Sequence, residues 1–260
     1  MKYRENRQLD IDHIHIYGCS MPAGHEINDP QIKQKMWSEE RQIQAREKNK
    51  KESWPAVFAD LLGVTYTNNA QYGASNGDAR GKLTTDILGN KIKNNHAVFF
   101  CPTIISRVNT FDPIGGKPMS YQLHELDNTL MDFYNDYKIL FDYFTDLYTV
   151  LTLVKAVGAP CYFIPMFTPV TYDSMQSYAP YHPDIDWNDA AYAWQELKGL
   201  ERIMRELNDL DTGIIPFNQW VILKEGSHEG KYRYSGGHPK QHMHVKYGKI
   251  LYDLLRVEDT

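Results

Sequence analysis

Residues 14–24, Ile-His-Ile-Tyr-Gly-Cys-Ser-Met-Pro-Ala-Gly, restrict the fold more than any other stretch, because they form a strand that must end in a tight turn. The first four residues alternate between isoleucine and a polar ring, which is the period of a β-strand that enters a core. Glycine and proline follow at once and prevent the strand from continuing. Ser20 therefore lies just past the carboxyl end of a strand, at the edge where open α/β sheets bind their ligands.

Strand and helix patterns alternate along the rest of the chain. We predict strands over residues 11–17, 64–68, 97–101 and 161–165, and a short strand or a loop over 217–223. We predict helices over residues 52–63, 79–92, 189–207 and 241–255, and one or two helices in the aromatic-rich stretch 123–157. This alternation predicts an α/β fold in which a parallel sheet carries helices on both faces.

Three stretches interrupt this alternation. Residues 25–53 carry many charges of both signs at helical spacing, which predicts a solvated helical insertion beside Ser20. We interpret this insertion as a surface excursion rather than a lid. A Pro/Gly-rich loop is expected over residues 109–118. Residues 168–187 combine several prolines and tyrosines without a regular pattern, so we expect a loop of the substrate pocket there.

The composition is that of an ordinary globular protein. The 260 residues fit one domain, and the net charge of −5 shows no basic excess of the kind that duplex-binding proteins carry. Cys19, Cys101 and Cys161 lack metal-ligand spacing, and we interpret them as small buried residues in a reducing compartment. The first residues are polar and no apolar run is long enough to span a membrane, so we expect a cytoplasmic protein.

A second motif lies near the other end of the chain. Residues 235–244, Ser-Gly-Gly-His-Pro-Lys-Gln-His-Met-His, precede the last predicted helix. A glycine-proline turn before a helix holds the imidazole of His238 on a rigid loop. A serine hydroxyl activated by an imidazole is the usual pair of nucleophilic catalysis, which makes Ser20 and His238 candidate partners.

Together these motifs resemble the SGNH (GDSL-like) hydrolase superfamily, and most closely the divergent branch that is common in tailed-phage genomes. Ser20 falls on the nucleophile of the first block, which here runs Gly-Cys-Ser. Gly73, within the second block at residues 69–76, falls on the glycine whose N–H serves the oxyanion hole. His238 falls on the general base of the last block. The resemblance implies a flavodoxin-like three-layer αβα sandwich with a central parallel sheet, as one domain over residues 1–260.

The sequence departs from the pattern of this superfamily at three places. Cys19 stands where the usual first block has Asp, although Cys there is familiar in the phage branch. The third block has no Asn after its strand, and Thr103 is the nearest positional substitute. The last block has Ser235 and Gly236 where an Asp normally precedes the histidine. The departures fall on the site rather than on the scaffold.

The resemblance implies a serine esterase-type hydrolase that removes an acyl group from a carbohydrate or a lipid through a Ser20–His238 dyad. N–H groups at Ser20 and Gly73, with a side-chain donor from Thr103, would form the oxyanion hole. The residues expected to support this site are Ser235, Arg107 and Asn76. We expect no cofactor, a small-molecule or glycan ester as substrate, no nucleic acid or membrane partner, and association with a virion or with further copies of the chain.

Two alternatives remain open from the sequence. The first is a non-catalytic phage structural or binding protein that keeps a degenerate SGNH fold. The second is a metal-dependent hydrolase whose ligands are His13, His15, His238 and His242, since His-x-His on a first strand recurs in such enzymes. The alternation of a strand also explains the first two of these histidines, because it places both on one face. His242 and His244 are expected at the start of the last helix as packing residues.

Overall fold

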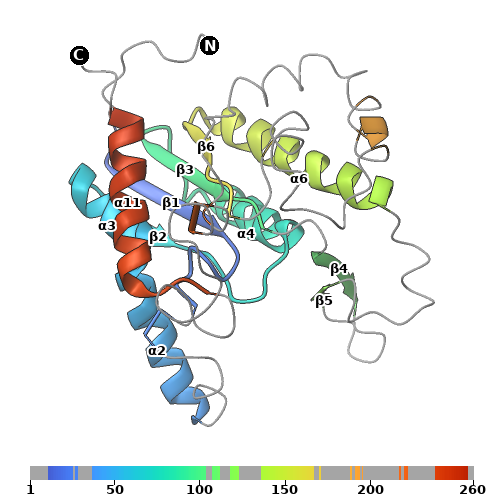
Figure 1. Cartoon of the computed structure of the whole chain (residues 1–260). Coiled ribbons are helices and arrows are strands. Elements are labelled where there is room, and N and C mark those ends of the chain that lie inside the picture. Colours follow the sequence, from blue (N-terminus) through green and yellow to red (C-terminus); the bar gives the residue numbers. More distant parts are fainter. Residues whose placement is uncertain are drawn as a thin grey trace.

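The structure of the chain is a computed structural model, shown in Figure 1. It describes residues 11–25, 27–28, 37–103, 107–111, 118–122, 136–166, 170, 188, 191–193, 195, 217, 220–221 and 238–256. The predicted helix over residues 189–207 and the predicted loop over 168–187 lie almost wholly outside the described residues. Within the described residues, no helix has an apolar stretch long enough to cross a bilayer.

The centre of the described fold is a parallel sheet with the strand order β2-β1-β3-β6. Its strands are β1 (His13–Gly18), β2 (Thr65–Asn68), β3 (His96–Cys101) and β6 (Cys161–Phe163). Each lies within about two residues of its predicted position. Because all four strands run the same way, their carboxyl ends meet at one edge of the sheet, and that edge carries Ser20.

One face of the sheet is covered by two helices, α3 (Trp54–Leu62) and α11 (Gln241–Arg256), which lie side by side in Figure 1. Ile16 and Phe99 point from the sheet into this layer, where they meet the fully buried Tyr247 of α11. Burying a large apolar side chain is worth roughly 1.5–3 kcal/mol, so this layer is held mainly by apolar contact.

The opposite face is covered by α4 (Asn76–Leu88) and α6 (Asp136–Val157). Phe100 points into this layer and shares a core cluster with Phe144 and Leu147 of α6, all three fully buried. Successive residues of a strand point to opposite faces, so neighbours in β3 serve different layers. The three-layer α/β sandwich expected from the sequence is confirmed.

Helix α3 begins and ends where the sequence predicts. Ser53 occupies its N-cap position and Pro55 lies in its first turn, where a missing N–H costs nothing. The Ser53 hydroxyl makes no capping bond and instead donates to the carbonyl of Lys50 at 2.8 Å. Gly63 ends the helix in the left-handed conformation, with φ of 71°.

Helix α4 begins three residues earlier than predicted. Its N-cap is Ser75, whose hydroxyl accepts from the N–H of Asp78 at 3.1 Å, while the Asp78 carboxylate accepts from the N–H of Ser75 at 3.0 Å. This reciprocal pair is a capping box. The predicted start at residue 79 was wrong, because the capping box makes Asn76 the first helical residue.

A buried carboxylate joins α4 to the sheet. Asp86 is 2% exposed and accepts hydrogen bonds from Lys82 and Lys91 at 2.8 Å each and from the hydroxyl of Tyr17 at 3.0 Å. Burial alone would raise the pKa of the Asp86 carboxyl, but the hydrogen bonds from these three donors lower that pKa below its ordinary value. The bond to Tyr17 fixes α4 against β1 near the edge that carries Ser20.

Two further segments differ from the sequence predictions. Residues 109–111 and 118, predicted as part of a Pro/Gly-rich loop, belong instead to a second, antiparallel sheet of β4 (Arg107–Phe111) and β5 (Pro118–Gln122). The described residues of the predicted strand or loop 217–223 are helical. They are Phe217, Trp220 and Val221, whose spacing puts them on one helix face that packs under α11.

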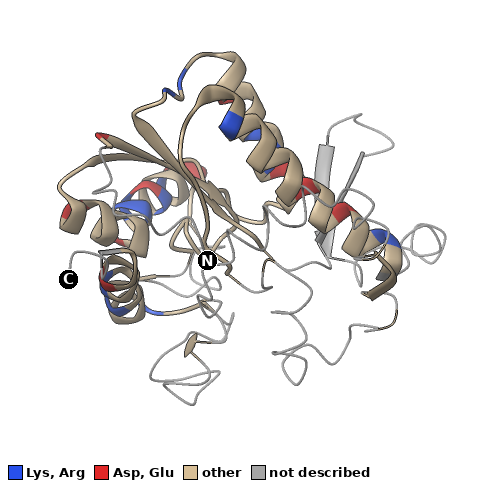
Figure 2. Ribbon diagram, turned by 90° about the horizontal axis from the view of Figure 1, so that it is seen from above, with Lys and Arg blue, Asp and Glu red and all other residues tan. Residues whose placement is uncertain are grey.

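The predicted insertion contains one helix in the described residues, α2 (Glu39–Glu52). Ser38 caps it through the N–H of Arg41, and acidic residues in its first turn and lysines in its last complement the helix dipole. Figure 2 shows Lys and Arg intermixed with Asp and Glu on the helices, whereas the four strands of the central sheet carry none of them. The charged side chains of α2 are mostly exposed to solvent, as the sequence suggests.

Candidate active site

The turn after β1 is fixed by close contact with β3. Gly18 pairs with Cys101, and a Cβ atom on Gly18 would stand 2.8 Å from both the Cβ and the carbonyl oxygen of Cys101. Only glycine fits there. The turn then closes on itself, because the N–H of His25 donates to the carbonyl of Ser20 at 2.9 Å and the N–H of Gly24 to that of Met21 at 3.0 Å. Ser20 is held at the edge of the sheet and is 7% exposed.

The structure places His238 against this serine. The Nε2 atom of His238 lies 2.9 Å from the Oγ atom of Ser20, although the two residues are 218 positions apart in the sequence. A serine hydroxyl that donates to Nε2 requires the other ring nitrogen to carry the proton, and this tautomer leaves Nε2 free to accept the serine proton. The predicted proximity of Ser20 and His238 is confirmed, while their catalytic roles stay predictions.

Helix α11 sets the position of His238, which precedes its first turn. The Nδ1 atom of His244 accepts from the N–H of Trp54 at 3.2 Å, and a Cβ atom on Gly248 would stand 3.0 Å from the carbonyl oxygen of Trp54. Burial lowers the pKa of the His244 imidazole to about 3, with a smaller contribution from His238, so the ring is a neutral packing group as expected. Because α11 packs closely on α3, the imidazole of His238, just before α11, is held next to the hydroxyl of Ser20.

The second block lies at the same edge. The N–H of Gln71 donates to the carbonyl of Gly18 at 3.0 Å, which joins this loop to the turn after β1. Gly73 is exposed, has φ of 78°, and a Cβ atom there would meet nothing within 4 Å. A glycine in this conformation, directly before the N-terminus of α4, presents backbone toward open space, as a donor to an anion must.

Asn76 and Thr103 are joined to each other at this edge. The N–H of Thr103 donates to the Oδ1 atom of Asn76 at 2.9 Å, and the two residues are 5% and 1% exposed. The main-chain N–H of Thr103 is therefore committed, which leaves only its hydroxyl for the role predicted from the sequence. The bond also fixes the carboxamide of Asn76, whose Nδ2 atom makes no hydrogen bond among the described residues.

Other predicted site residues fall outside what the structure describes. Ser235 lies among residues 222–237, which the structure does not describe. For Arg107 the structure gives the backbone, as the first residue of β4, but not the side chain. Their predicted support of the site stays a prediction.

Two aromatic rings beside His238 were missed in the sequence analysis. The centroid of the His25 ring lies 4.5 Å from that of His238, and the His25 ring stacks on Tyr72 at 4.4 Å with an interplanar angle of 21°. Nothing in the local pattern predicts this contact, because it joins the turn after β1, the second block and the last block. The only sequence signal is that His25 directly follows the turn that carries Ser20 and that Tyr72 lies within the second block.

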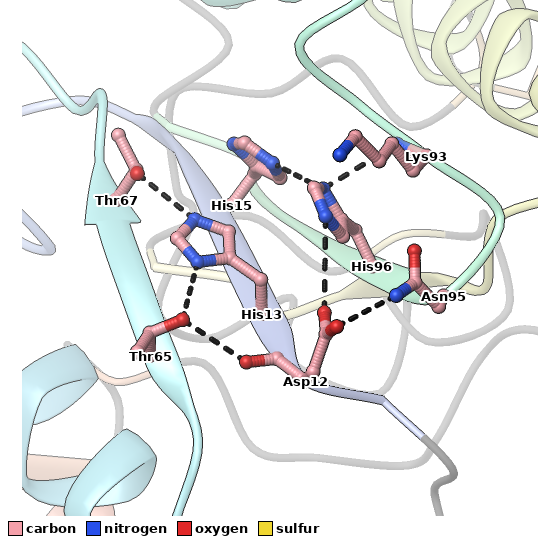
Figure 3. Close-up of polar contacts among 8 residues, drawn as sticks. All are labelled: Asp12, His13, His15, Thr65, Thr67, Lys93, Asn95 and His96. Atoms are coloured by element: carbon pink, nitrogen blue, oxygen red, sulfur yellow. Dashed lines mark hydrogen bonds and ion pairs between the residues drawn. The ribbon is translucent and has the colours of Figure 1, made fainter.

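The histidines of the metal hypothesis are divided between two places. His13 and His15 lie in the amino-terminal half of β1, next to His96, as Figure 3 shows, whereas His238 lies beyond the carboxyl end of that strand. Among the described residues, no group of three or more His, Cys, Asp or Glu side chains is placed to hold a metal ion. The four predicted ligands therefore do not form one site.

Polar neighbours already engage this histidine group. The Nε2 atom of His15 lies 2.9 Å from Nδ1 of His96, and the two ring nitrogens of His13 lie 2.7 Å and 2.9 Å from the hydroxyls of Thr65 and Thr67. Burial, and next to it the neighbouring His13 and His96, lower the pKa of His15 to about 4. We interpret the group as a structural cluster at the end of the sheet remote from Ser20.

Acidification is expected to destabilise the fold through His15 and His244. Burial lowers the pKa of these two imidazoles to about 4 and about 3 in the folded protein, whereas in the unfolded chain both take up protons below the ordinary histidine pKa of 6.5. Unfolding then binds protons, so the free energy of unfolding falls as the pH drops from about 6.5 to about 4. Asp146 opposes this trend, because burial raises its pKa to about 6.

Denaturant unfolding at a series of pH values measures the effect. His15→Phe keeps a ring in place and removes one titrating group, so it is expected to flatten the slope of the free energy of unfolding by about 1.4 kcal/mol per pH unit between pH 4 and 6. Ile43→Phe, at an exposed position of α2 with no titrating side chain, is the control and is expected to leave the slope unchanged. An unchanged slope in His15→Phe would show that His15 is protonated or accessible in the folded state.

Comparison with known structures shows that the described fold is SGNH hydrolase-like. One similar structure is a carbohydrate esterase whose active site displays divergent catalytic and non-catalytic binding functions, with 12% identity, a TM-score of 0.51, and coverage of 97% of this chain and 69% of that one. Another is a carbohydrate esterase family 2 enzyme with a carbohydrate-binding domain from Corynascus thermopiles (Myceliophthora fergusii), with 12% identity, a TM-score of 0.50, and coverage of 95% and 66%.

A G-D-S-L family lipolytic protein from Veillonella parvula shares 12% identity with a TM-score of 0.45, over 95% of this chain and 99% of that one. No protein-family model and no curated protein matches the sequence. The chain spans about two thirds of the length of the two carbohydrate esterases. The two carbohydrate esterases therefore confirm the expected fold. Their sequence identity of 12% supports a likeness of fold alone.

Proposed function

We propose that this protein is a serine hydrolase of the esterase type, in which Ser20 is the nucleophile and His238 is the general base. The observation that carries the proposal is the 2.9 Å distance between the Ser20 hydroxyl and the His238 ring, which is within hydrogen-bond reach. Both groups lie at the carboxyl edge of the parallel sheet, where open α/β folds bind their ligands. The SGNH hydrolase-like fold supports the same reading.

The reaction takes two steps on these groups. Ser20 attacks the ester carbonyl carbon while Nε2 of His238 takes the hydroxyl proton. The tetrahedral intermediate then collapses, the bond to the leaving alcohol breaks, and His238 returns the proton to that alcohol. A water molecule, deprotonated by His238, then attacks the acyl-serine, and the acid leaves as Ser20 recovers its proton. No group beyond the ester and water is consumed.

The negative oxygen of each tetrahedral intermediate needs donors fixed in advance. We assign two of them to the N–H groups of Ser20 and Gly73, since both lie at this edge and Gly73 faces open space. For the third we favour the carboxamide of Asn76 over the hydroxyl of Thr103. The bond from the Thr103 N–H holds Oδ1 of Asn76, and this leaves the Nδ2 hydrogens to donate.

The substrate is proposed as an acyl ester, such as an acetyl group, on a carbohydrate or a lipid. This choice rests on analogy with the fold, since one fold hosts many substrates. The two structures of higher TM-score are carbohydrate esterases, which makes acetylated sugars the first substrates to assay. Arg107 and the loop over residues 168–187 are retained as proposed parts of the substrate pocket.

A fluorophosphonate probe tests the proposal directly, because it forms a covalent bond with an activated serine. We expect labelling of the 260-residue chain that disappears in Ser20→Ala and persists in Ser38→Ala, which alters the N-cap of α2 instead. Peptide mapping is expected to place the adduct on Ser20. A folded wild-type protein that takes up no probe would contradict the proposal and favour the non-catalytic binding protein considered from the sequence.

A further inference from the structure

A row of side chains in contact with one another leads from α2 to the nucleophile. The guanidinium carbon of Arg46 lies 5.2 Å from the centroid of the Tyr72 ring. Tyr72 stacks on His25 at 4.4 Å, His25 lies 4.5 Å from His238, and His238 reaches Ser20 at 2.9 Å.

The middle of this row is held from two sides. On one side, the N–H of His25 donates to the carbonyl of Ser20 at 2.9 Å, so His25 moves with the residue that carries the nucleophile. On the other side, the turn rests on α2, because Gly24 has φ of 70° and a Cβ atom there would stand 2.7 Å from the carbonyl oxygen of Asn49. The Nδ2 atom of Asn49 also lies 3.5 Å from the Tyr72 hydroxyl, at the limit of a hydrogen bond.

The imidazole of a serine hydrolase must keep one orientation, because a ring turned away cannot accept the serine proton. Here Ser235 and Gly236 stand where the superfamily has its orienting Asp. We propose that His25, backed by Tyr72, is a positioning residue that fixes the plane of the His238 ring by packing against it at an interplanar angle of 58°; the proposal rests on the proposed function of Ser20 and His238.

Another use of Tyr72 fits the geometry less well. An aromatic ring beside a nucleophile can serve as a platform for a sugar, but such a ring offers a free face to its ligand. The Tyr72 ring already stacks in parallel on His25 and has Arg46 beside it. Burial raises the pKa of the Tyr72 hydroxyl, so it is a neutral phenol and not an ionised group in this row. The ring is therefore better suited to support His25 than to bind substrate.

Kinetics of p-nitrophenyl acetate hydrolysis in matched variants test the inference. His25→Ala removes the ring and is expected to lower kcat by about 10–10²-fold with little change in KM, since a small misplacement of a catalytic group costs up to about 10²-fold. His25→Phe keeps a flat ring that can stack and is expected to recover most of the loss. Lys249→Ala, an exposed side chain of the helix that follows His238, is the control and is expected to behave as wild type.

The inference is overturned if His25→Ala keeps the wild-type kcat, or if His25→Phe is as slow as His25→Ala while both remain folded. These outcomes leave the proposed function intact, because wild type would still hydrolyse the ester and Ser20→Ala would not. NMR of ¹⁵N-labelled histidine decides the question even in a protein without esterase activity. One sharp set of His238 ring signals is expected in wild type and His25→Phe, and broadened signals in His25→Ala; unchanged signals in His25→Ala would overturn the inference.

Discussion

Ester hydrolysis is expected to fall by about 10³–10⁴-fold or more in Ser20→Ala and in His238→Ala, and no further in the double variant. The reason is that the hydroxyl and the imidazole act as one unit across the 2.9 Å contact, so that removing either removes the whole nucleophilic route. The activity that remains above buffer would come from binding and from the oxyanion donors, which these substitutions leave in place. The measurement is kcat for p-nitrophenyl acetate in the three variants and in wild type.

The double variant is the informative one. Losses that multiply would mean that Ser20 and His238 contribute independently and would contradict a dyad. Each variant is also to be compared with wild type in denaturant unfolding, because both side chains are removed from the edge of the sheet and not from its core. A variant that loses stability together with activity would neither support nor contradict the dyad. If His238→Ala behaves in this way, His238→Gln replaces it as the less disruptive change.

Asn76→Asp is expected to lower kcat by about 10²–10³-fold, which is the typical loss for one oxyanion-hole donor. Aspartate has the shape of asparagine and keeps an oxygen to accept the N–H of Thr103, a bond of 2.9 Å in the structure. It replaces the Nδ2 donor by a second oxygen, and a negative charge there repels the negative oxygen of the tetrahedral intermediate. The N-terminus of α4 favours an acidic side chain, so the fold is expected to tolerate the change.

Thr103→Val is the matched control for this prediction. Valine has nearly the volume of threonine, keeps the main-chain N–H that bonds to Asn76, and loses only the hydroxyl. We expect its kcat to stay close to that of wild type. If Thr103→Val instead shows the large loss and Asn76→Asp shows none, the hydroxyl of Thr103 is the third donor and our assignment to Asn76 is wrong.

The scaffold could be predicted from the sequence because its signals are local. β3 and β6 are short apolar runs, and β1 alternates isoleucine with polar rings before a glycine. Helix α3 has Ser53 before it, Pro55 in its first turn and Gly63 at its end. The first residue of α4 was harder to predict, because Ser75, Asn76 and Asp78 are all residue types that favour the N-cap position. Only the reciprocal bonds between Ser75 and Asp78 decide among them.

The candidate site could be predicted only where it lies on short motifs. Ser20 and His238 were found because each follows a recognisable turn, and their contact was then inferred from the resemblance. The stacking of His25 on Tyr72 could not be found in this way, because it depends on how three loops meet in space. The close approach of Gly24 to the carbonyl oxygen of Asn49 likewise depends on how the turn after β1 and α2 meet in space.

The packing of α11 on α3 determines the order in which parts of the protein are expected to unfold on heating. His238 has its place through a terminal helix that rests on Trp54, whereas Ser20 follows the strand at the middle of the sheet. Detachment of this one helix separates base from nucleophile while the strands and their hydrogen bonds stay intact. Thermal inactivation should therefore precede loss of the sheet, and cooling should restore activity as soon as the helix returns.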